Sequence, residues 1–352
     1  MSKTVATDRR FSVEDIVRDV RERGDEAVAE WSRLLDGTTA ARPERATPYG
    51  DLPVAAVLDA ATSIRTWHEG QRPNDLVMEV SPGVTLERRW SPLRSVGVYV
   101  PRGLVSSLLM GVVPAQVAGV DRIVVCTPPE GSAAVAAAAA LLGLDEVWAV
   151  GGAQAIAALA YGTESIAAVD KIVGPGGGAV NSAKLLVSHD VAIDLPAGPS
   201  EVVVVADEGV DEALIAQEVA AQMEHGPDSR AFVVRVGDDL EAALAEVEGH
   251  AGEHVALLGP RAESLADRIR NAGAVFVGPY APVPAGDYAT GANHVLPTGG
   301  WARSTGGLGL ESFLKTVTVQ RVTREGLARL GPTVEALADL EGMPRHKATM
   351  RR

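Results

Sequence analysis

The chain has 352 residues, of which 46% are hydrophobic, enough for a large core and about two domains. Its formal net charge of −14 at pH 7 argues against nucleic acid or an anionic membrane as a main partner. Its one cysteine, Cys126, excludes a disulfide within the chain, and residues 1–11 lack the apolar core of a signal peptide. No apolar stretch reads as a membrane span, so we expect a cytoplasmic protein.

The first elements along the chain are expected to be helices. Ser12 precedes acidic residues and an apolar period, which indicates a capped amphipathic helix over residues 12–35 that Gly24 interrupts. Residues 36–52 are rich in proline, glycine and threonine and indicate a loop. Residues 53–72 return to a helical pattern.

The next segment alternates strands with helices. Apolar and polar residues alternate over residues 76–100, which predicts strands. Beyond residue 104 the helices are about ten residues long, a pattern typical of a doubly wound, mostly parallel α/β sheet. The expected strands are 122–127, 146–150, 171–173, 191–194 and 201–206, and the expected helices are 104–118, 133–142, 153–161 and 178–187.

A second α/β segment runs from Asp211 to Gly278, followed by a polar loop over residues 279–306. The tail beyond residue 340 is too short to form a core, so it must dock on its own chain or on a partner subunit. The expected helices here are 211–224, 239–249, 261–272, 309–316 and 333–340, and the expected strands are 231–236, 254–258 and 274–277.

Residues 222–229, Gln-Met-Glu-His-Gly-Pro-Asp-Ser, concentrate polar groups where Gly226 and Pro227 must end a helix. Gln222 and His225 are three positions apart and would share one helix face. An amide oxygen and an imidazole nitrogen on one face can bind Zn²⁺. A solvated helix face or an ordinary cap is the commoner explanation of such a pair, so the rest of the chain must decide.

Glycine-rich segments follow several expected strands. Residues 99–103 (Tyr-Val-Pro-Arg-Gly) and residues 151–154 (Gly-Gly-Ala-Gln) each follow a strand, and residues 174–178 (Gly-Pro-Gly-Gly-Gly) open a helix. Helix N-termini attract phosphate, so the last two segments could hold a dinucleotide. Neither matches G-x-G-x-x-G, and glycine-rich turns between a strand and a helix are common for structural reasons alone.

Other polar positions also admit two interpretations. Residues 194–201 form a tight turn that could be purely structural, and the acid, amide and imidazole of residues 286–294 fit either a site or a set of turns and caps. Glu253 and His254 open a strand, where their side chains would point to opposite faces as a charged strand edge. His346 fits a solvated basic tail. The histidines assigned structural roles are His68, His189 and His250.

Taken in order, these segments resemble the histidinol dehydrogenase family, zinc- and NAD-dependent enzymes that complete histidine biosynthesis. The resemblance spans about residues 12–350. The matching strings are GGAQAIAALAYGTESIAAVDKIVGPG, AGPSE, EHGPDS, GDYATGANHVLPT and EGMPRH.

The resemblance implies a residue set for each role. The implied zinc ligands are Gln222, His225, Asp287 and His346. Glu253 and His254 match the family's catalytic pair, and Tyr99, Gln154 and the position of Gly177 match its NAD contacts. The implied substrate-binding set is Ser200, Gln222, His225, Glu253, His254, Asp287, His294, Glu341 and His346.

The implied reaction is the oxidation of an amino alcohol, through the aldehyde, to the acid with two NAD⁺. His254 would act as general base, Glu253 would help to activate the water that hydrates the aldehyde, and the zinc would orient the substrate. In the family the C-terminal segment reaches the partner subunit, so Glu341 and His346 would complete the site of the other chain in a homodimer.

The implied fold has two Rossmann-like doubly wound α/β domains and a helical C-terminal extension that docks on the partner subunit. Residues 12–98 and 202–306 would form a discontinuous domain with the zinc and catalytic residues. Residues 99–201 would form the NAD-binding domain, and residues 307–352 the extension, swapped in the dimer.

The chain departs from the family pattern at several positions. Arg102 replaces a glycine, Gly177 replaces an NAD-contacting asparagine with Ala179 where an aromatic residue is usual, and Gly252 stands where proline is favoured. The segment between Ser229 and Glu253 is shorter than usual, as if a helix–strand portion were missing. These departures leave open a paralogous zinc/NAD dehydrogenase acting on another small amino alcohol or diol.

Two functions from other classes of protein remain as alternatives to a dehydrogenase. A metal-dependent hydrolase would use zinc to activate water and would need no NAD. A non-catalytic zinc-binding dimer would have no use for the pair Glu253 and His254.

Overall fold

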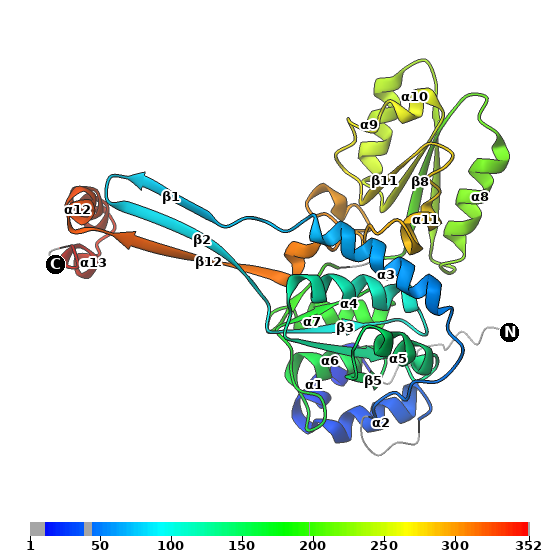
Figure 1. The fold of residues 1–352 in the computed structure, drawn as a ribbon, viewed down its shortest axis with the longest axis horizontal. Coiled ribbons are helices and arrows are strands. Elements are labelled where there is room, and N and C mark those ends of the chain that lie inside the picture. Colours follow the sequence, from blue (N-terminus) through cyan, green and yellow to red (C-terminus); the bar gives the residue numbers. More distant parts are fainter. Residues whose placement is uncertain (1–10, 39–43, 197, 351–352) are drawn as a thin grey trace. The chain divides into compact units, whose positions relative to one another are not determined.

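The computed structural model describes residues 11–38, 44–196 and 198–350. The chain forms two compact units, one built from residues 11–71 and 93–313 and the other from residues 72–92 and 314–350 (Figure 1). Within the described residues, no helix combines the length and the apolar character needed to cross a membrane.

The first sheet of the larger unit has five parallel strands. Its order, β5-β4-β3-β6-β7, reverses direction beside β3, as in Rossmann-type sheets, where ligands bind at the carboxyl ends of the strands beside the reversal. The strands are β3 (Ser95–Tyr99), β4 (Arg122–Thr127), β5 (Val147–Ala149), β6 (Lys171–Val173) and β7 (Ala192–Ile193).

Helices cover both faces of this sheet. A Cβ on Gly111 of α4 would lie 2.5 Å from Val98, and a Cβ on Gly97 would lie 2.9 Å from Leu159 of α6. Because consecutive strand residues point to opposite faces, α4 and α6 lie on opposite faces. The connecting helices are α4 (Val105–Ala118), α5 (Ser132–Leu141), α6 (Gly152–Tyr161) and α7 (Gly178–Val187).

The N-terminal helices are α1 (Val13–Arg23) and α2 (Asp25–Leu35), and their apolar residues join the core formed with α6 and α7. Ser12 caps α1 through the expected capping box with Asp15, and the break falls at Gly24. Residues 12–35 therefore pack with the first sheet, whereas the sequence-based grouping placed them with residues 202–306.

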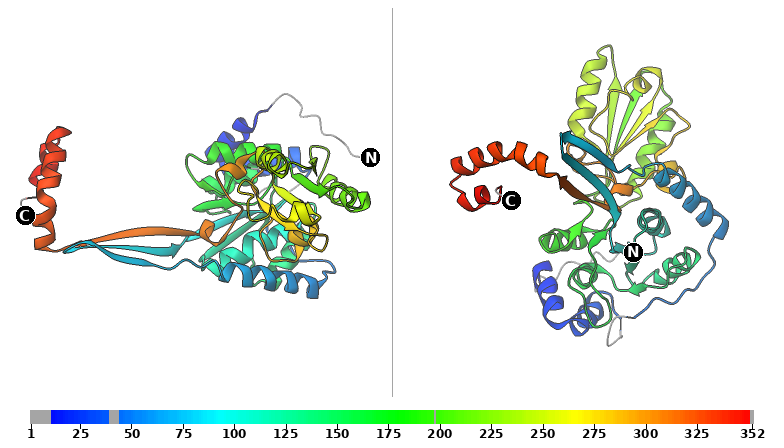
Figure 2. Two further views of the ribbon diagram at one scale, coloured as in Figure 1. Left: turned by 90° about the horizontal axis from the view of Figure 1, so that it is seen from above. Right: turned by 60° about the vertical axis from the view of Figure 1, so that its left-hand side comes forward.

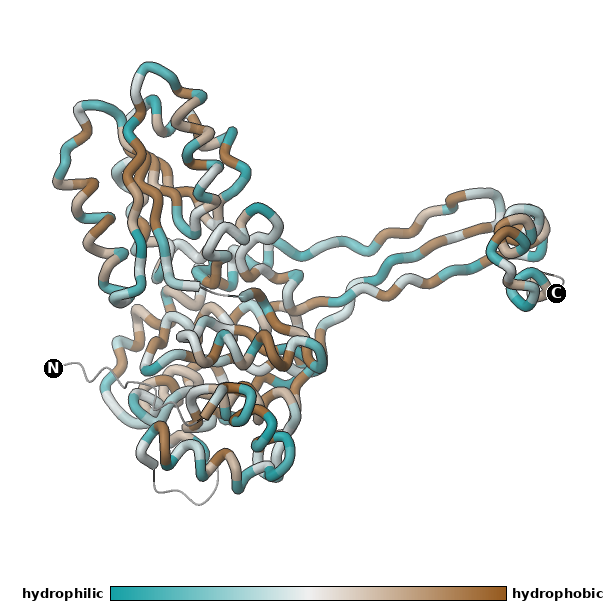
Figure 3. Tube along the Cα trace, turned by 180° about the vertical axis from the view of Figure 1, so that it is seen from behind, coloured by the Kyte–Doolittle hydropathy of each residue, from teal (hydrophilic) through white to brown (hydrophobic). Residues whose placement is uncertain are grey.

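The second sheet of this unit has four parallel strands in the order β11-β10-β8-β9. Residues that alternate along its buried strands, drawn brown in Figure 3, feed two separate apolar clusters, one on each face. The strands are β8 (Glu201–Asp207), β9 (Arg230–Val236), β10 (His254–Leu258) and β11 (Ala274–Val277), and the main helices are α8 (Glu212–Met223) and α9 (Leu240–His250).

Two expected elements differ in this unit. The helix expected over residues 261–272 is only one turn, α10 (Pro260–Glu263), and the expected loop 279–306 contains α11 (Val283–Tyr288) and the 3₁₀ turn η1 (Trp301–Arg303). Pro282 fixes the backbone φ angle just before α11, which favours the start of a helix there. A count of glycine and proline residues indicates only a loop and does not reveal this helix start. The helix expected over residues 53–72 is α3 (Val54–Glu69).

The smaller unit is an antiparallel three-stranded sheet of β1 (Leu76–Ser81), β2 (Val84–Pro92) and β12 (Leu314–Val322), with α12 (Arg324–Leu340) and α13 (Pro344–Ala348) (Figure 2). The prediction of a helix over residues 309–316 was wrong, because a short 3₁₀ turn, η2 (Leu310–Phe313), is followed directly by β12. The four residues from Thr316 to Val319 are all β-branched, with threonine and valine alternating, which favours a strand. The C-terminal extension is therefore part strand and part helix.

Candidate active site

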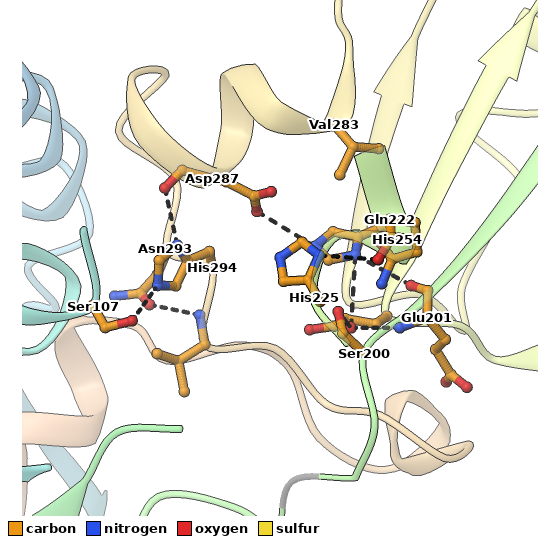
Figure 4. A network of polar contacts seen from close by, with 12 residues as sticks. Ser107, Ser200, Glu201, Gln222, His225, His254, Val283, Asp287, Asn293 and His294 are labelled. Atoms are coloured by element: carbon orange, nitrogen blue, oxygen red, sulfur yellow. Dashed lines mark hydrogen bonds and ion pairs between the residues drawn. The ribbon is translucent and has the colours of Figure 1, made fainter. Parts of the chain in front are cut away.

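The amino ends of β8 and β10 bring together three of the expected site residues. The two strands are parallel neighbours, with His254 opposite Val202, so Ser200 and Glu253 lie side by side just before them. The Ser200 hydroxyl donates a 2.6 Å hydrogen bond to Glu253 Oε2, and the Glu201 amide donates to the same oxygen at 2.8 Å (Figure 4).

Glu253 is a protonated acid at neutral pH. Its side chain is buried, and burial raises its pKa to about 8, although the hydrogen bonds from Ser200 and Glu201 oppose the shift. A carboxyl group in this state can give up its proton within the range where many enzymes work.

His254 is a neutral imidazole with a free lone pair. Its Nδ1 lies 3.2 Å from the Glu201 carbonyl oxygen, which only accepts, so Nδ1 carries the proton and Nε2 does not. Burial lowers the pKa of His254 to about 4. Nε2 is buried without a hydrogen-bond partner and lies 3.7 Å from Asp287 Oδ1.

The expectation that Glu253 and His254 point to opposite faces of a strand was wrong. Strand β10 begins at His254, so Glu253 precedes the strand and is not bound to its alternation. Glu253 Oε2 consequently lies 3.7 Å from His254 Nδ1, and both side chains meet the backbone of Glu201.

Asp287 and His294 come from the region of residues 283–298. Burial raises the pKa of Asp287 to about 6, and its carboxylate points toward His254 (Figure 4). The Nδ1 of His294 lies 2.9 Å from the Asp287 carbonyl oxygen, and its Nε2 lies 3.3 Å from Ser107 Oγ on α4. Asn293 donates to the Met110 carbonyl at 2.7 Å, which further holds this loop against α4.

Gln222 and His225 lie at the end of α8. The helix stops at Met223, so Gln222 is in its last turn and His225 follows in the turn beyond, not on the same helix face as expected. His225 is exposed, and its Nδ1 lies 3.2 Å from the Gln222 carbonyl oxygen. This contact engages one ring nitrogen and leaves Nε2 available for a ligand.

Gln222 provides the test of whether a metal fits. Its side chain is 2% exposed, and neither Oε1 nor Nε2 has a hydrogen-bond partner. A buried amide without partners is costly, and a cation at Oε1 would relieve that cost. Over the described ranges no cluster of three or more His, Cys, Asp or Glu side chains is placed to hold a metal. The implied set has only His225 and Asp287 of those types in the larger unit.

Glu341 and His346 belong to the smaller unit, at the end of α12 and on α13. Both are exposed.

The expected cofactor residues lie at the carboxyl edge of the first sheet. Tyr99 ends β3, and its hydroxyl accepts a 3.2 Å hydrogen bond from the Gly152 amide at the start of α6, while burial raises its pKa to about 12. Gln154, fully buried on α6, donates to Asp36 at 3.0 Å, and its Oε1 has no partner. Gly177 is the exposed N-cap of α7.

Sequence reasoning missed three residues of these sites. Glu201 received no role of its own, although it ends the matching string AGPSE, yet its backbone contacts both Glu253 and His254. Glu218 accepts from the Val283 amide at 3.2 Å and links α8 to α11, and Asp36 lies in the expected loop 36–52. Their signal was weak, because a lone acid on a helix or in a loop is usually solvated.

The reversed order of the first sheet and the buried acid–imidazole pair define an α/β enzyme with a Rossmann-like sheet. The family model described as histidinol dehydrogenase matches residues 2–243 and 233–352, and the chain belongs to this family.

Relatives and solved structures agree with this assignment. The histidinol dehydrogenase of Natronomonas pharaonis is 44% identical over 96% of this chain and 92% of its own length, and that of Methanothermobacter thermautotrophicus is 42% identical over 97% and 92%. The crystal structure of histidinol dehydrogenase from Elizabethkingia anophelis aligns with a TM-score of 0.89 at 33% identity, covering 96% of this chain and 90% of that one. An acetylating aldehyde dehydrogenase from Geobacillus thermoglucosidasius, with a TM-score of 0.51 at 12% identity, shares the fold alone.

The comparisons also support the shortened segment before Glu253. The alignment with the Natronomonas relative has 391 positions, more than the 352 residues of this chain, so the relative carries residues that this chain lacks. The two ranges matched by the family model meet at residues 233–243, within β9 and α9.

Proposed function

We propose that this protein is an NAD-dependent histidinol dehydrogenase that oxidises L-histidinol through histidinal to L-histidine. The observation that carries the proposal is the buried neutral His254, whose Nε2 has no partner, beside the protonated Glu253 and the carboxylate of Asp287.

In the first oxidation, His254 Nε2 takes the hydroxyl proton of the alcohol while the carbon that bears the hydroxyl group loses a hydride. The product of this step is the aldehyde. The Glu201 carbonyl holds Nδ1–H and fixes the ring with Nε2 directed away from it. The charge that forms on His254 lies 3.7 Å from Asp287 Oδ1, which stabilises it.

In the second oxidation, water adds to the aldehyde and the hydrate loses a further hydride and proton to become the acid. Glu253, once ionised, accepts a proton of this water while the protonated His254 gives its proton to the carbonyl oxygen, and His254 then takes the proton that the hydrate loses. The Ser200 hydroxyl and the Glu201 amide stabilise the carboxylate of Glu253. Because burial raises the pKa of Glu253 to about 8, the second step should gain rate as the pH rises toward 8.

Zinc would be held by Gln222, His225, Asp287 and His346, and when bound it supplies a Lewis acid that orients the amino group and imidazole of the substrate. The orphaned amide of Gln222 supports this assignment. Ser200, His294 and Glu341 would contact the substrate, as the family resemblance implies.

NAD would lie at the carboxyl edge of the first sheet, near Tyr99, Gln154 and Gly177, and when bound it accepts the hydride. The buried amide of Gln154, with its unpartnered Oε1, supports this placement. Domain boundaries at residues 12–98 with 202–306, 99–201 and 307–352 remain part of the proposal, except that residues 12–35 pack on the first sheet and residues 72–92 belong to the smaller unit.

A homodimer would complete the site, with Glu341 and His346 supplied by the partner's C-terminal segment. The smaller unit exposes large apolar side chains, including Val77 at 66% and Leu340 at 82%, which supports burial against another subunit. With its single buried cysteine, the protein fits the cytoplasm.

The direct test is NADH formation from L-histidinol and NAD⁺ by zinc-loaded protein, with the product identified. Two molecules of NADH for each histidine establish the four-electron reaction. No turnover by folded, zinc-bound protein would instead favour the paralogous dehydrogenase, to be sought with other small amino alcohols and diols.

The shared site has its own test. Chains carrying His254→Ala are mixed with chains carrying His346→Ala, and subunit exchange is confirmed. One of the two sites in each heterodimer then has both residues intact. Because random exchange makes about half of the dimers heterodimers, the activity of an equal mixture should return toward a quarter of that of the unmodified protein. Exchange without recovery would reject a site shared between subunits.

A further inference from the structure

Lys184 and Asp194 form an ion pair buried beneath the carboxyl edge of the first sheet. Their side chains are only 2% and 0% exposed. Removing two charges from water is costly, and apolar residues of similar volume often stabilise a protein as well or better. Stability alone therefore does not explain the pair, and its hydrogen bonds to the surrounding backbone indicate another role.

Both charged groups bind the backbone around Gly174. Asp194 Oδ2 accepts a 2.8 Å hydrogen bond from the Gly174 amide, and Lys184 Nζ donates to the Gly174 carbonyl at 3.0 Å. Lys184 also donates to the Leu195 carbonyl at 3.3 Å. The pair thus fastens both peptide groups of one residue and ties them to the start of the next segment.

Gly174 cannot move far from this position. Its φ is +116°, and a Cβ there would lie 2.1 Å from the Tyr99 carbonyl oxygen, so only glycine fits against the end of β3. The residue is held between Tyr99 on one side and the ion pair on the other.

Gly174 follows β6, which neighbours β3 at the reversal of strand order. The next residues, 175–178, lead into the exposed N-cap of α7 at Gly177. This loop borders the crevice at the reversal of strand order, where Rossmann-type sheets bind a dinucleotide, and the free amides of a helix N-terminus attract its phosphates.

We propose that Lys184 and Asp194 are positioning residues for the cofactor: they fix the loop of residues 174–178 against Tyr99 and thereby set the affinity for NAD. This inference rests on the proposed function, which places the dinucleotide at this edge. The pair acts on the cofactor through backbone atoms and does not touch the reacting groups.

The experiment compares a double variant, which carries both Lys184→Met and Asp194→Asn, with the unmodified holoenzyme. It removes both charges, so no single charge is left buried, and it removes the lysine's hold on the carbonyls of Gly174 and Leu195. A matched control, Arg235→Met with Glu212→Gln, removes an ion pair between β9 and α8 whose side chains are 42% and 74% exposed.

NADH binding is followed by fluorescence titration, together with the melting temperature, the zinc content and the kinetics at saturating NAD⁺. We expect the double variant to fold and keep its zinc, to bind NADH at least tenfold more weakly, and to raise the KM for NAD⁺ with little change in kcat. The control should bind NADH as the unmodified protein does.

A second variant, Lys184→Arg, covers the case in which the double variant does not fold. It keeps the charge, but the longer planar group cannot reproduce the contacts to Gly174 and Leu195 together, so NADH binding should again weaken. Unchanged NADH binding in whichever variant folds would overturn the inference. Failure of the unmodified, zinc-loaded protein to bind NADH or to oxidise histidinol would instead overturn the proposed function.

Discussion

Glu253 Oε2 and His254 Nδ1 lie 3.7 Å apart, and burial moves the pKa values of the two groups in opposite directions. The carboxyl group takes up a proton and the imidazole loses one, because each buried group favours its neutral form. At pH 7 the pair is therefore an uncharged acid beside an uncharged base, held by the same residue, Glu201.

This state predicts how stability depends on pH. Folded Glu253 has a pKa of about 8 against an ordinary value of 4.5, so between these values the folded protein binds a proton that the unfolded chain lacks. The contribution of Glu253 to the free energy of unfolding therefore falls as the pH rises from 4.5 to 8. Glu253→Gln removes this loss, on the order of 5 kcal/mol over the whole window.

The measurement is urea unfolding of metal-free protein at a series of pH values from 5 to 9. The variant should gain stability relative to the unmodified protein as the pH rises, with no further gain above about pH 8. Glu246→Gln, at an exposed position on α9, is the control and should leave the difference flat. Parallel curves for Glu253→Gln would mean that Glu253 is already ionised in the folded protein.

Gln222 predicts opposite changes in stability and metal binding. Methionine has nearly the same shape as glutamine without its buried polar atoms, so Gln222→Met should stabilise the metal-free protein by about 1 kcal/mol. The same change removes a proposed ligand, so zinc affinity should fall at least tenfold. Gln217→Met, exposed on the same helix, should change neither quantity. Undiminished zinc binding by Gln222→Met, measured by competition with a chelator, would exclude Gln222 as a ligand.

Glu218 predicts a positioning effect on the same site. Its carboxylate accepts from the Val283 amide, and one helical turn further along each helix lie Gln222 on α8 and Asp287 on α11. Glu218→Ala should release α11 and weaken zinc binding several-fold. Glu218→Gln keeps an acceptor for the Val283 amide, so its zinc affinity should stay close to that of the unmodified protein. Equal losses in the two variants would assign the effect to charge rather than to this hydrogen bond.

The parallel sheets could be predicted from the sequence because alternating strands and helices leave a strong local signal. The elements that were missed depend on distant partners. Strand β12 pairs with β2, more than 200 residues away in the chain, and α11 is docked by Glu218. Neither partner is visible in a local window of sequence.

The identities of the candidate site residues came from the resemblance to a family, whereas their states required the structure. Periodicity did place His254 at the start of a strand, but it gave no sign that the Glu201 backbone would hold both members of the pair. The burial that shifts the pKa values of Glu253 and His254 comes from packing of the second sheet, which no single motif encodes.

The departure at Gly177 can be tested by restoring the residue usual in the family. Its φ of −67° suits any residue, and a Cβ there would meet nothing within 4 Å, so Gly177→Asn should be accommodated without strain. Asparagine is also a favoured N-cap residue, so the melting temperature of the variant should not fall. The added amide supplies a polar contact at the proposed NAD site, and one such contact contributes about 1 kcal/mol, or roughly a fivefold tighter binding of NADH.

Gly177→Ala, which adds the Cβ without the amide, should bind NADH no better than the unmodified protein. If both variants bind NADH equally well in fluorescence titrations, the asparagine side chain does not contact the cofactor in this chain, and the substitution at Gly177 has no bearing on its affinity for NAD.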